Sequence, residues 1–468
     1  VHKMSGTLTT AKKFEALSSA KSFDQDHRRK INFNMGRYHQ AVSKGAVDYR
    51  DLELARDRAA DIRWRAVEHL EVNLLRFESA ARDNGVRVVW AADAAQALEA
   101  VLEVVRRHRA KLVVKSKSMV TEEIHLNSGL EKNGIRVVET DLGEYIQQLD
   151  EEPPYHIVTP AMHKSKEDVA SLFHRKLGTD PNASPEELTQ HARTLLRDQY
   201  LEAGVGITGA NFLLADTGGV CLTENEGNAR MSTSFVKSHI VIAGIEKVIE
   251  SSEDLDLMWP LLASRGTGQQ MTAYNTIFHG PRRTSEADGP SEMVVILLDN
   301  GRTRLLADPV MRQSLHCIRC GACLNACPVY KNIGGHSYGA TYSGPIGKVI
   351  SPHLLPFQDF QHLSQASSLC GNCTEVCPVR IPLHQLILAN RRQAANDPQV
   401  HSATSSQRLM WRAWARAMQH RPLLDLIGSR TKAWLLRNFL ASAWGHRRHL
   451  PSPASKSFQQ QWSEQKQG

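Results

Sequence analysis

Short apolar runs rich in β-branched residues alternate with amphipathic stretches of helical length between residues 66 and 304. Strands that alternate with helices of ten to fifteen residues are typical of βαβ units. We therefore predict an α/β domain over residues 66–304, built on a parallel, Rossmann-like sheet. The runs that we interpret as strands are Val86–Ala92, Lys111–Met119, Gly134–Asp141, Tyr155–Ala161, Ala210–Asn225, His239–Ile249 and Glu292–Asn300.

The remaining segments have a different pattern. Residues 1–65 are polar, charge-rich and helical in periodicity, and we expect these helices to pack on the segments that follow. Residues 305–390 consist of short helical stretches broken by Gly and Pro. Residues 391–450 form a basic, Trp-rich helical extension, and residues 451–468 have the composition of a disordered tail.

Composition narrows the class of protein. The 468 residues carry a formal charge of +8, which is compatible with an acidic partner, an anionic membrane surface or nucleic acid. Eight cysteines are present, seven of them clustered near the C-terminal third, which does not resemble a disulfide framework. The N-terminus lacks the apolar core of a signal peptide, and no apolar run has membrane-spanning length. We therefore expect a cytoplasmic protein.

The clustered cysteines begin with a C-x2-C-x2-C-x3-C-P motif. It contains Cys317, Cys320, Cys323 and Cys327, followed by Pro328. In ferredoxins with two clusters, three cysteines of such a run bind one cluster and the fourth binds the other. A second run contains Cys370, Cys373 and Cys377, again followed by proline. The rule assigns Cys317, Cys320, Cys323 and Cys377 to one cluster.

The second cluster lacks one cysteine. Cys327, Cys370 and Cys373 form its set, and Ser367 stands where the missing thiolate is expected. Three alternatives are open. The cluster is [4Fe–4S] with a non-cysteine fourth ligand such as Ser367 or water, it is [3Fe–4S], or Cys221 supplies the fourth thiolate. Structural zinc is a weaker interpretation, because zinc takes four ligands in two pairs and not seven in ferredoxin spacing.

Three weaker motifs lie in the α/β domain. Gly204–Gly209 matches G-x-G-x-x-G, but it follows a helix and precedes an apolar run, so we favour a glycine turn over a dinucleotide site. Lys115 and Lys117 follow a predicted strand, where α/β folds bind ligands, and could contact an anion. A later stretch offers Glu224, Glu226 and Arg230. Both stretches are also compatible with solvated loops.

The helical extension is strongly basic. Between residues 403 and 450, arginine and lysine outnumber a single acidic residue, Asp425, and four tryptophans are interleaved. Such helices suit an anionic membrane surface or an acidic partner, although a helical cap with an exposed basic face is the simpler interpretation. Nucleic acid is disfavoured, because no nucleic-acid-binding module accompanies the charge. The basic and Trp residues are Arg408, Trp411, Arg412, Trp414, Arg416, Arg421, Arg430, Lys432, Trp434, Arg437, Trp444, Arg447 and Arg448.

Four motifs together give the chain a family resemblance. KSKSM, VGITGANFLLADTGGVCLTENEGNAR, CGACLNACPVYKNIGGHSYGATYSGPIG and SSLCGNCTEVCPV occur in this order. In these motifs the chain resembles the lactate utilization protein B family, the iron–sulfur subunits of a bacterial L-lactate oxidation complex. The resemblance implies an α/β lactate-utilization domain, a helical ferredoxin domain and a helical extension. It also implies two [4Fe–4S] clusters, one held by Cys317, Cys320, Cys323 and Cys377, and one held by Cys327, Cys370 and Cys373.

The resemblance gives a functional hypothesis. We expect an electron-transfer component of an oxidoreductase complex that converts L-lactate to pyruvate, inactive alone. Its expected partners are a cysteine-rich iron–sulfur protein and a second protein with an α/β lactate-utilization domain, with peripheral membrane contact through the basic extension. The alternatives are a ligand-binding, redox-sensing regulatory module and an electron-transfer subunit for another 2-hydroxy acid such as glycolate.

Overall fold

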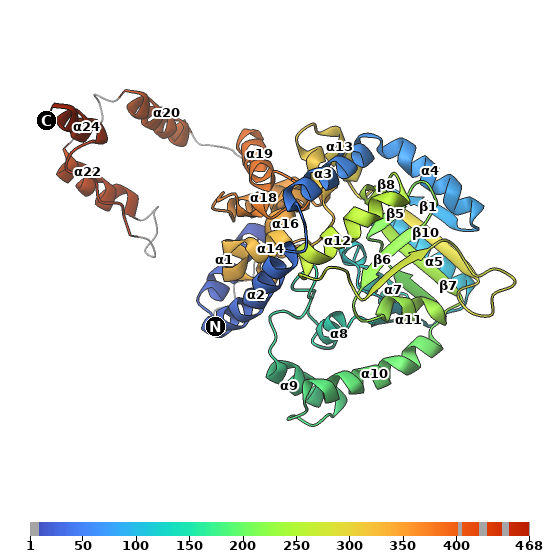
Figure 1. Cartoon of the computed structure of the whole chain (residues 1–468). Helices are drawn as coiled ribbons and strands as arrows, with labels where there is room; N and C mark the ends of the chain where they lie inside the picture. Colours follow the sequence, from blue (N-terminus) through green and yellow to red (C-terminus); the bar gives the residue numbers. More distant parts are fainter. Residues whose placement is uncertain (1–8, 401–404, 421–427, 442–448, 468) are drawn as a thin grey trace. The chain divides into compact units, whose positions relative to one another are not determined.

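Six parallel strands form the central sheet, in the order β1-β10-β7-β4-β2-β3 (Figure 1). Every neighbouring pair in this sheet is parallel, as expected for an α/β domain. The computed structural model describes residues 9–400, 405–420, 428–441 and 449–467. The strands are β1 (Arg87–Ala91), β2 (Leu112–Lys115), β3 (Arg136–Glu139), β4 (Val205–Thr208), β7 (Ser238–Gly244) and β10 (Glu292–Leu298).

Side chains from the two faces of this sheet enter different hydrophobic clusters. Ile240 and Ile242 pack against α5 and α7, whereas Val241 and Ala243, which alternate with them along β7, pack against α4 and the second sheet. The period of two along a strand produces this division. The covering helices are α4 (Leu70–Asp83), α5 (Ala94–Arg107), α6 (Met119–Glu123), α7 (Leu126–Lys132), α8 (Leu142–Leu149) and α11 (Asn228–Ser234).

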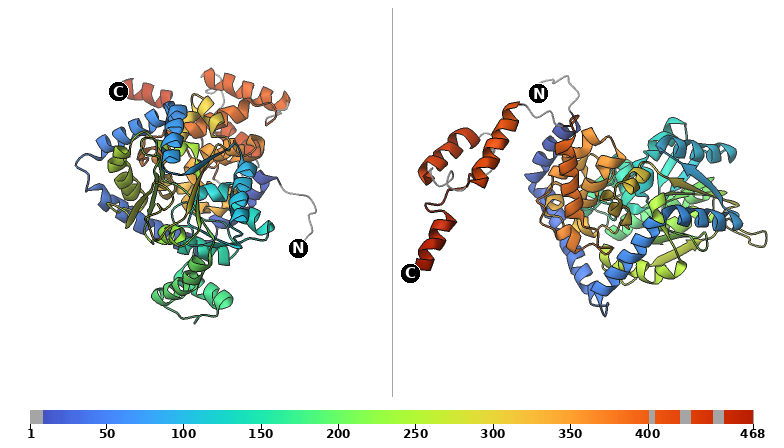
Figure 2. Two further views of the ribbon diagram at one scale, coloured as in Figure 1. Left: turned by 90° about the vertical axis from the view of Figure 1, so that its right-hand side faces the viewer. Right: turned by 90° about the horizontal axis from the view of Figure 1, so that it is seen from above.

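A second, four-stranded sheet has the order β8-β5-β6-β9. Its strands are β5 (Phe212–Leu214), β6 (Val220–Glu224), β8 (Val248–Ile249) and β9 (Tyr274–Phe278), with η1 (Ile245–Lys247) between β7 and β8 and η2 (Ser252–Asp254) after β8. Helices α9 (Lys166–Leu177) and α10 (Pro185–Glu202) form an arm that projects from the sheet in both figures, and the end of α10 packs Leu196 and Tyr200 against β2 (Figures 1 and 2).

The prediction of a parallel α/β domain is confirmed, but two local expectations were wrong. Tyr155–Ala161 is not a strand. It bends because the Nδ1 atom of His156 accepts the backbone N–H groups of Val158 and Thr159. The glycine-rich stretch at Gly204–Gly209 contains strand β4 itself. Position 206 within β4 requires glycine, because a Cβ atom there would come 1.9 Å from the carbonyl oxygen of Ser232.

The helices that surround the cysteine motifs lie on one side of the molecule's main body, and the strands lie on the other (Figures 1 and 2). The N-terminal helices pack here, as expected: α1 and α2 contact α15, and α3 contacts η3. The helical elements are α1 (Thr10–Ser22), α2 (Gln25–Ala46), α3 (Leu52–Glu68), α12 (Leu255–Gly266), α13 (Arg302–Ala307), η3 (Met311–His316), α14 (Ala322–Ala326), α15 (Pro328–Ile333), η4 (His336–Tyr338), α16 (Gly344–Leu354), α17 (Phe357–Phe360), η5 (Gln361–Gln365), α18 (Asn372–Glu375) and α19 (Leu383–Asn396).

One hydrophobic core joins the α/β part to the helices around the cysteines. It includes Phe212 of β5, Met258 of α12, Ile31 of α2 and Leu324 of α14. The described residues up to Asn396 accordingly form a single compact unit, and those from Asp397 onward form another. The finer division that we predicted, with a boundary near residue 304, stays a prediction.

The second unit contains α20 (Ser405–Gln419), α22 (Ser429–Leu435), η6 (Leu436–Leu440) and α24 (Phe458–Gln467). Helix α24 lies where we expected a disordered tail, and Ser457 at its start accepts the backbone N–H of Gln460. Trp411 and Trp414 of α20 are exposed and in edge contact. Arg421, Asp425, Trp444, Arg447 and Arg448 lie outside the described residues. Among the helices that the structure describes, none is long and apolar enough to cross a membrane.

Candidate functional site

Four cysteines from the two motifs line one cavity. Cys317, Cys320 and Cys323 come from the first motif and Cys377 from the second, and the cavity walls are otherwise mainly apolar, with Ile157, Ile318, Ile346, Val379, Ile381 and Leu383. This is the set that the sequence rule assigns to one cluster.

A second cavity is lined by Cys327, Cys370 and Cys373. Ser367 lies on the wall of this cavity, and so does His384, which the sequence analysis did not single out. The Nδ1 atom of His384 is 2.7 Å from the hydroxyl oxygen of Thr374. Cys221 lines neither cavity; it is buried in β6, in the register opposite Phe212, and burial raises the pKa of its thiol to about 12.

The two motifs have the same backbone conformation. In the first, Arg319 and Gly321, on either side of Cys320, both have positive φ angles, of 61° and 80°. In the second, Leu369 and Gly371, on either side of Cys370, have φ angles of 55° and 83°. Glycine after the cysteine tolerates this conformation without strain. Each turn then leads into a short helix that carries the next cysteine.

Two buried arginines of α3 hold the ends of the first cavity in place. Arg63 is 1% exposed and donates to the backbone carbonyls of Glu246, Val248, Leu315 and His316, the last of which directly precedes Cys317. Two turns earlier in α3, Arg56 donates to the carbonyl of Cys377, at 2.9 and 3.1 Å. The N-terminal helices therefore help to bring the two motifs together.

Hydrogen-bond donors point at several of the sulfur atoms. Backbone N–H groups of Arg319, Tyr330 and Ile381 lie 3.4–3.5 Å from the sulfurs of Cys317, Cys327 and Cys377 respectively. The ammonium group of Lys348, on α16, is fully buried and lies 3.6 Å from the sulfur of Cys327. A buried cation and several N–H donors directed at sulfur suit a negatively charged group held by thiolates.

Burial by itself disfavours the thiolate form of the cysteines when no cluster is bound. It raises the pKa of Cys320 to about 12 and the pKa of Cys373 and Cys377 to about 11. The thiolate form therefore needs compensating positive charge, which bound iron supplies. The residues present thus fit iron–sulfur clusters, while the assignment of each cysteine to a cluster stays a prediction.

The two lysines that could contact an anion have different environments. Lys115 is fully buried among carboxylates of the chain itself, with its Nζ atom 2.8 Å from Glu139, 3.0 Å from Glu122 and 3.9 Å from Glu144. An anion contact at Lys115 is disfavoured, because these carboxylates already surround it. Lys117 instead lines a large cavity.

This cavity has a volume of about 610 Å³ and lies between the α/β part and the first cysteine motif. Lys117, Arg319 and Cys320 line it, and so does Glu226. Burial and the nearby Asp141 raise the pKa of Glu226 to about 7. The volume of the cavity is within the range of small-molecule sites.

The remaining residues of the candidate loop have mainly structural contacts. Glu224 accepts the backbone N–H groups of Ala229 and Arg230 at the start of α11, and it also lines the large cavity. The guanidinium group of Arg230 lies over the ring of Tyr274, 5.6 Å from its centre. Arg230 is not among the cavity residues.

Two family models match the chain. Residues 74–298 match the LUD domain, and residues 313–381 match the 4Fe-4S dicluster domain. The second match covers all seven clustered cysteines and supports iron–sulfur clusters as the cofactors.

Curated relatives are similar over most of the chain. Lactate utilization protein B of Anoxybacillus flavithermus is 39% identical, over 93% of this chain and 99% of the relative. Lactate utilization protein B of Oceanobacillus iheyensis is 39% identical, over 96% and 95% respectively. An uncharacterized electron transport protein of Escherichia coli, YkgF, is 43% identical over 86% of each chain. The chain belongs to the lactate utilization protein B family.

Proposed function

We propose that the chain is the iron–sulfur electron-transfer subunit of a multi-subunit complex that oxidises L-lactate to pyruvate. The observation that carries this proposal is the pair of cysteine-lined cavities, each of which takes cysteines from both motifs. The names of the relatives, lactate utilization protein B and an electron transport protein, support the same role.

We assign two [4Fe–4S] clusters to the cavities. Cys317, Cys320, Cys323 and Cys377 would hold the first, and Cys327, Cys370 and Cys373 three irons of the second. When bound, such clusters accept and donate single electrons. The chain contributes burial, the N–H donors to sulfur and the cation of Lys348, which together set the potential.

We propose His384 as the fourth ligand of the second cluster. Its ring lies on the wall of the cavity, and the contact of Nδ1 with Thr374 leaves Nε2 for iron. Metal-binding histidines commonly have their second nitrogen held in this way. Ser367 is the competing candidate; its hydroxyl oxygen accepts the backbone N–H of Leu369 at 3.1 Å.

The large cavity supports a place for the substrate. It reaches Cys320, so an acid anion held by Lys117 would lie next to the residues that hold the first cluster. We propose that lactate binds in this cavity when the partner subunits are present. Those partners would be a cysteine-rich iron–sulfur protein and a second protein with a LUD domain.

The experiment is an add-back assay. Extract from a strain that lacks this gene should lose L-lactate-dependent dye reduction, and the anaerobically purified chain should restore it. A Cys323→Ser chain should fail to restore it, and its iron and sulfide content should fall. Full turnover of L-lactate by the purified chain alone would contradict a subunit role, and restoration of glycolate oxidation in place of lactate oxidation would identify the other 2-hydroxy acid.

A further inference from the structure

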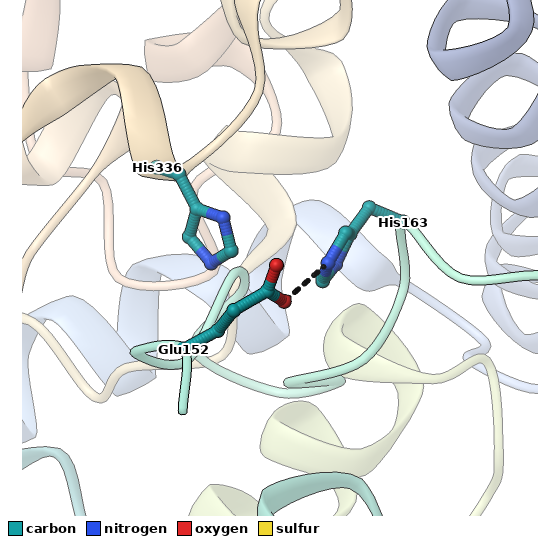
Figure 3. Close-up of side chains that lie close together, drawn as sticks. All are labelled: Glu152, His163 and His336. Atoms are coloured by element: carbon teal, nitrogen blue, oxygen red, sulfur yellow. Dashed lines mark hydrogen bonds and ion pairs between the residues drawn. The ribbon is translucent and has the colours of Figure 1, made fainter. Parts of the chain in front are cut away.

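Three potential metal ligands converge away from both cysteine cavities. Glu152 and His163 belong to the loop between α8 and α9, and His336 begins η4, just after the first cysteine motif. One nitrogen or oxygen from each side chain lies within 4.8 Å of the others. Figure 3 shows the two imidazole rings on either side of the Glu152 carboxylate, with one carboxylate oxygen directed between the rings.

Two glycines allow η4 to approach the loop this closely. A Cβ atom on Gly335 would lie 1.8 Å from the carbonyl oxygen of Tyr155, and Gly334 has a φ angle of 73°. The ring of Tyr155 is stacked on His163 and in edge contact with His336, at centroid distances of 4.5 and 5.1 Å. The positions of the two histidines are therefore defined by packing.

The geometry suits a cation with nitrogen and oxygen ligands. The Oε2 atom of Glu152 is 3.1 Å from the Nε2 atom of His163. A metal ion about 2.1 Å from both atoms would see them at an angle of about 95°, which is within reach of tetrahedral or octahedral coordination. The Nε2 atom of His336 is 2.7 Å from the carbonyl oxygen of Pro153, which leaves Nδ1 for the metal.

Charged groups also surround the site. Lys164 lies 3.0 Å from Glu152 and also pairs with Asp150. Asp150 also pairs with Arg175, at 3.7 Å, so two cations balance the two carboxylates, and a divalent ion would be held by its three ligands rather than by net negative charge.

We propose that Glu152, His163 and His336 bind a divalent transition-metal ion of the zinc type, separate from the iron–sulfur clusters. Two histidines and one glutamate are a zinc donor set that leaves a fourth position for water. The ion would join the loop that follows α8 to η4, and so join the LUD and dicluster parts of the chain. The proposal does not depend on the role in lactate oxidation.

The site lies near the second cluster cavity. The carbonyl oxygen of Tyr155 accepts a hydrogen bond from the hydroxyl of Tyr330, at 2.7 Å, and the backbone N–H of Tyr330 points at the sulfur of Cys327. An ion at this place would hold the Tyr155 loop against the helix that follows Cys327.

The test uses the anaerobically purified full chain with its clusters. After mild chelation, Zn²⁺ is added and bound metal is counted by mass spectrometry, while Zn K-edge absorption reports the ligands without interference from iron. We expect one Zn²⁺ per chain with N/O ligands at about 2.0–2.1 Å and no sulfur ligand near 2.3 Å.

Variants locate the site. Glu152→Gln and His336→Ala should each weaken Zn²⁺ binding at least about tenfold. His108→Ala is the matched control, because His108 and Glu292 form a similar pair, 2.7 Å apart, outside any metal-ligand group found among the described residues. The iron and sulfide content of each variant shows whether it has folded. If His336→Ala does not fold, the Zn²⁺ affinity of the nearly isosteric Glu152→Gln variant tests the site. Absence of stoichiometric zinc, sulfur ligation, or wild-type affinity in Glu152→Gln would overturn the proposal.

Discussion

The ammonium group of Lys348 lies 3.6 Å from the sulfur of Cys327, and both side chains are buried. Lys348 is on α16, twenty-one residues after the cysteine. Its ammonium also lies over the ring of Tyr338, 5.6 Å from the ring centre. A buried cation in contact with a cluster ligand stabilises the more negative, reduced state of the cluster, because water cannot screen the charge.

The Lys348→Met variant should therefore lower the midpoint potential of the second cluster. We expect a shift of at least about 60 mV, which corresponds to a tenfold change in a one-electron equilibrium. Redox titration followed by EPR measures this shift. Lys132→Met, at an exposed position on α7, is the control and should leave both potentials unchanged. Equal potentials in Lys348→Met and wild type would show that the ammonium does not act on the cluster.

The fourth ligand of the second cluster can be identified by spectroscopy. If His384 binds iron, pulsed EPR of the reduced chain should show ¹⁴N coupling that disappears in His384→Ala and persists in Ser367→Ala. The His384→Ala cluster should also convert more readily to a [3Fe–4S] form, because one iron loses its protein ligand. Absence of this ¹⁴N coupling in the wild type, with conversion to a [3Fe–4S] form in Ser367→Ala, would assign the position to Ser367, and unchanged spectra in both variants would leave water as the ligand.

The grouping of cysteines from both motifs around each cavity could be predicted, because ligand spacing is local and each motif repeats the same turn. Lys348 and His384 could not, since their contacts join residues separated by short helices whose packing no local pattern specifies. Within the fold, β-branched runs identified five of the six central strands, and β4 was missed because its glycines indicated a turn. The Tyr155–Ala161 run was wrongly predicted as a strand, because its backbone N–H groups bond to the His156 ring and not to a neighbouring strand.

Lys115 shows a second limit of sequence analysis. A lysine at the end of a parallel strand is a reasonable ligand-binding candidate, but the carboxylates that surround it come from α6, β3 and α8. Only the tertiary fold brings these three elements together, so no spacing in the sequence distinguishes Lys115 from Lys117, which does line a cavity.

Removal of the Lys115 charge should destabilise the chain strongly. Lys115→Met leaves Glu139 and Glu144 buried without a cation, and we expect the free energy of unfolding to fall by about 3–5 kcal/mol. Chemical denaturation measures this, with Lys111→Met at an exposed position as the control. Adding Glu139→Gln should recover part of the loss, because it removes one of the uncompensated charges. Wild-type stability in Lys115→Met would show that these carboxylates are protonated in the fold.

His239 should make the chain sensitive to acid. It is fully buried in β7 with Nε2 2.8 Å from the Thr208 hydroxyl, and burial lowers its pKa from 6.5 to about 3. The unfolded chain takes up a proton below pH 6.5 that the folded imidazole takes up only near pH 3. Its contribution to stability is therefore complete above pH 6.5 and decreases as the pH falls, by about 2 kcal/mol at pH 5.

The His239→Asn variant tests this linkage. It should be less stable than wild type at pH 7, but it should lose about 2 kcal/mol less on transfer to pH 5. Thermal unfolding of both chains at the two pH values gives the difference, and His174→Asn, at an exposed position, should follow wild type. Parallel losses in wild type and His239→Asn would show that other groups govern the acid response.

Substitution of Lys117 tests whether L-lactate binds in the large cavity. Its Nζ atom donates to the carbonyl oxygen of Val158 at 2.7 Å and lies 3.8 Å from Asp141, a longer contact than those that Lys115 makes with Glu139 and Glu122. In the add-back assay, Lys117→Met should raise the L-lactate concentration needed for half-maximal rate at least about tenfold, as expected for loss of a charged contact of 1.5–3 kcal/mol. The maximal rate should change less, because electron transfer through the clusters does not require this lysine.

Lys237→Met, at an exposed position, is the control. An unchanged half-maximal concentration in Lys117→Met would place lactate on a partner subunit and leave the electron-transfer role intact.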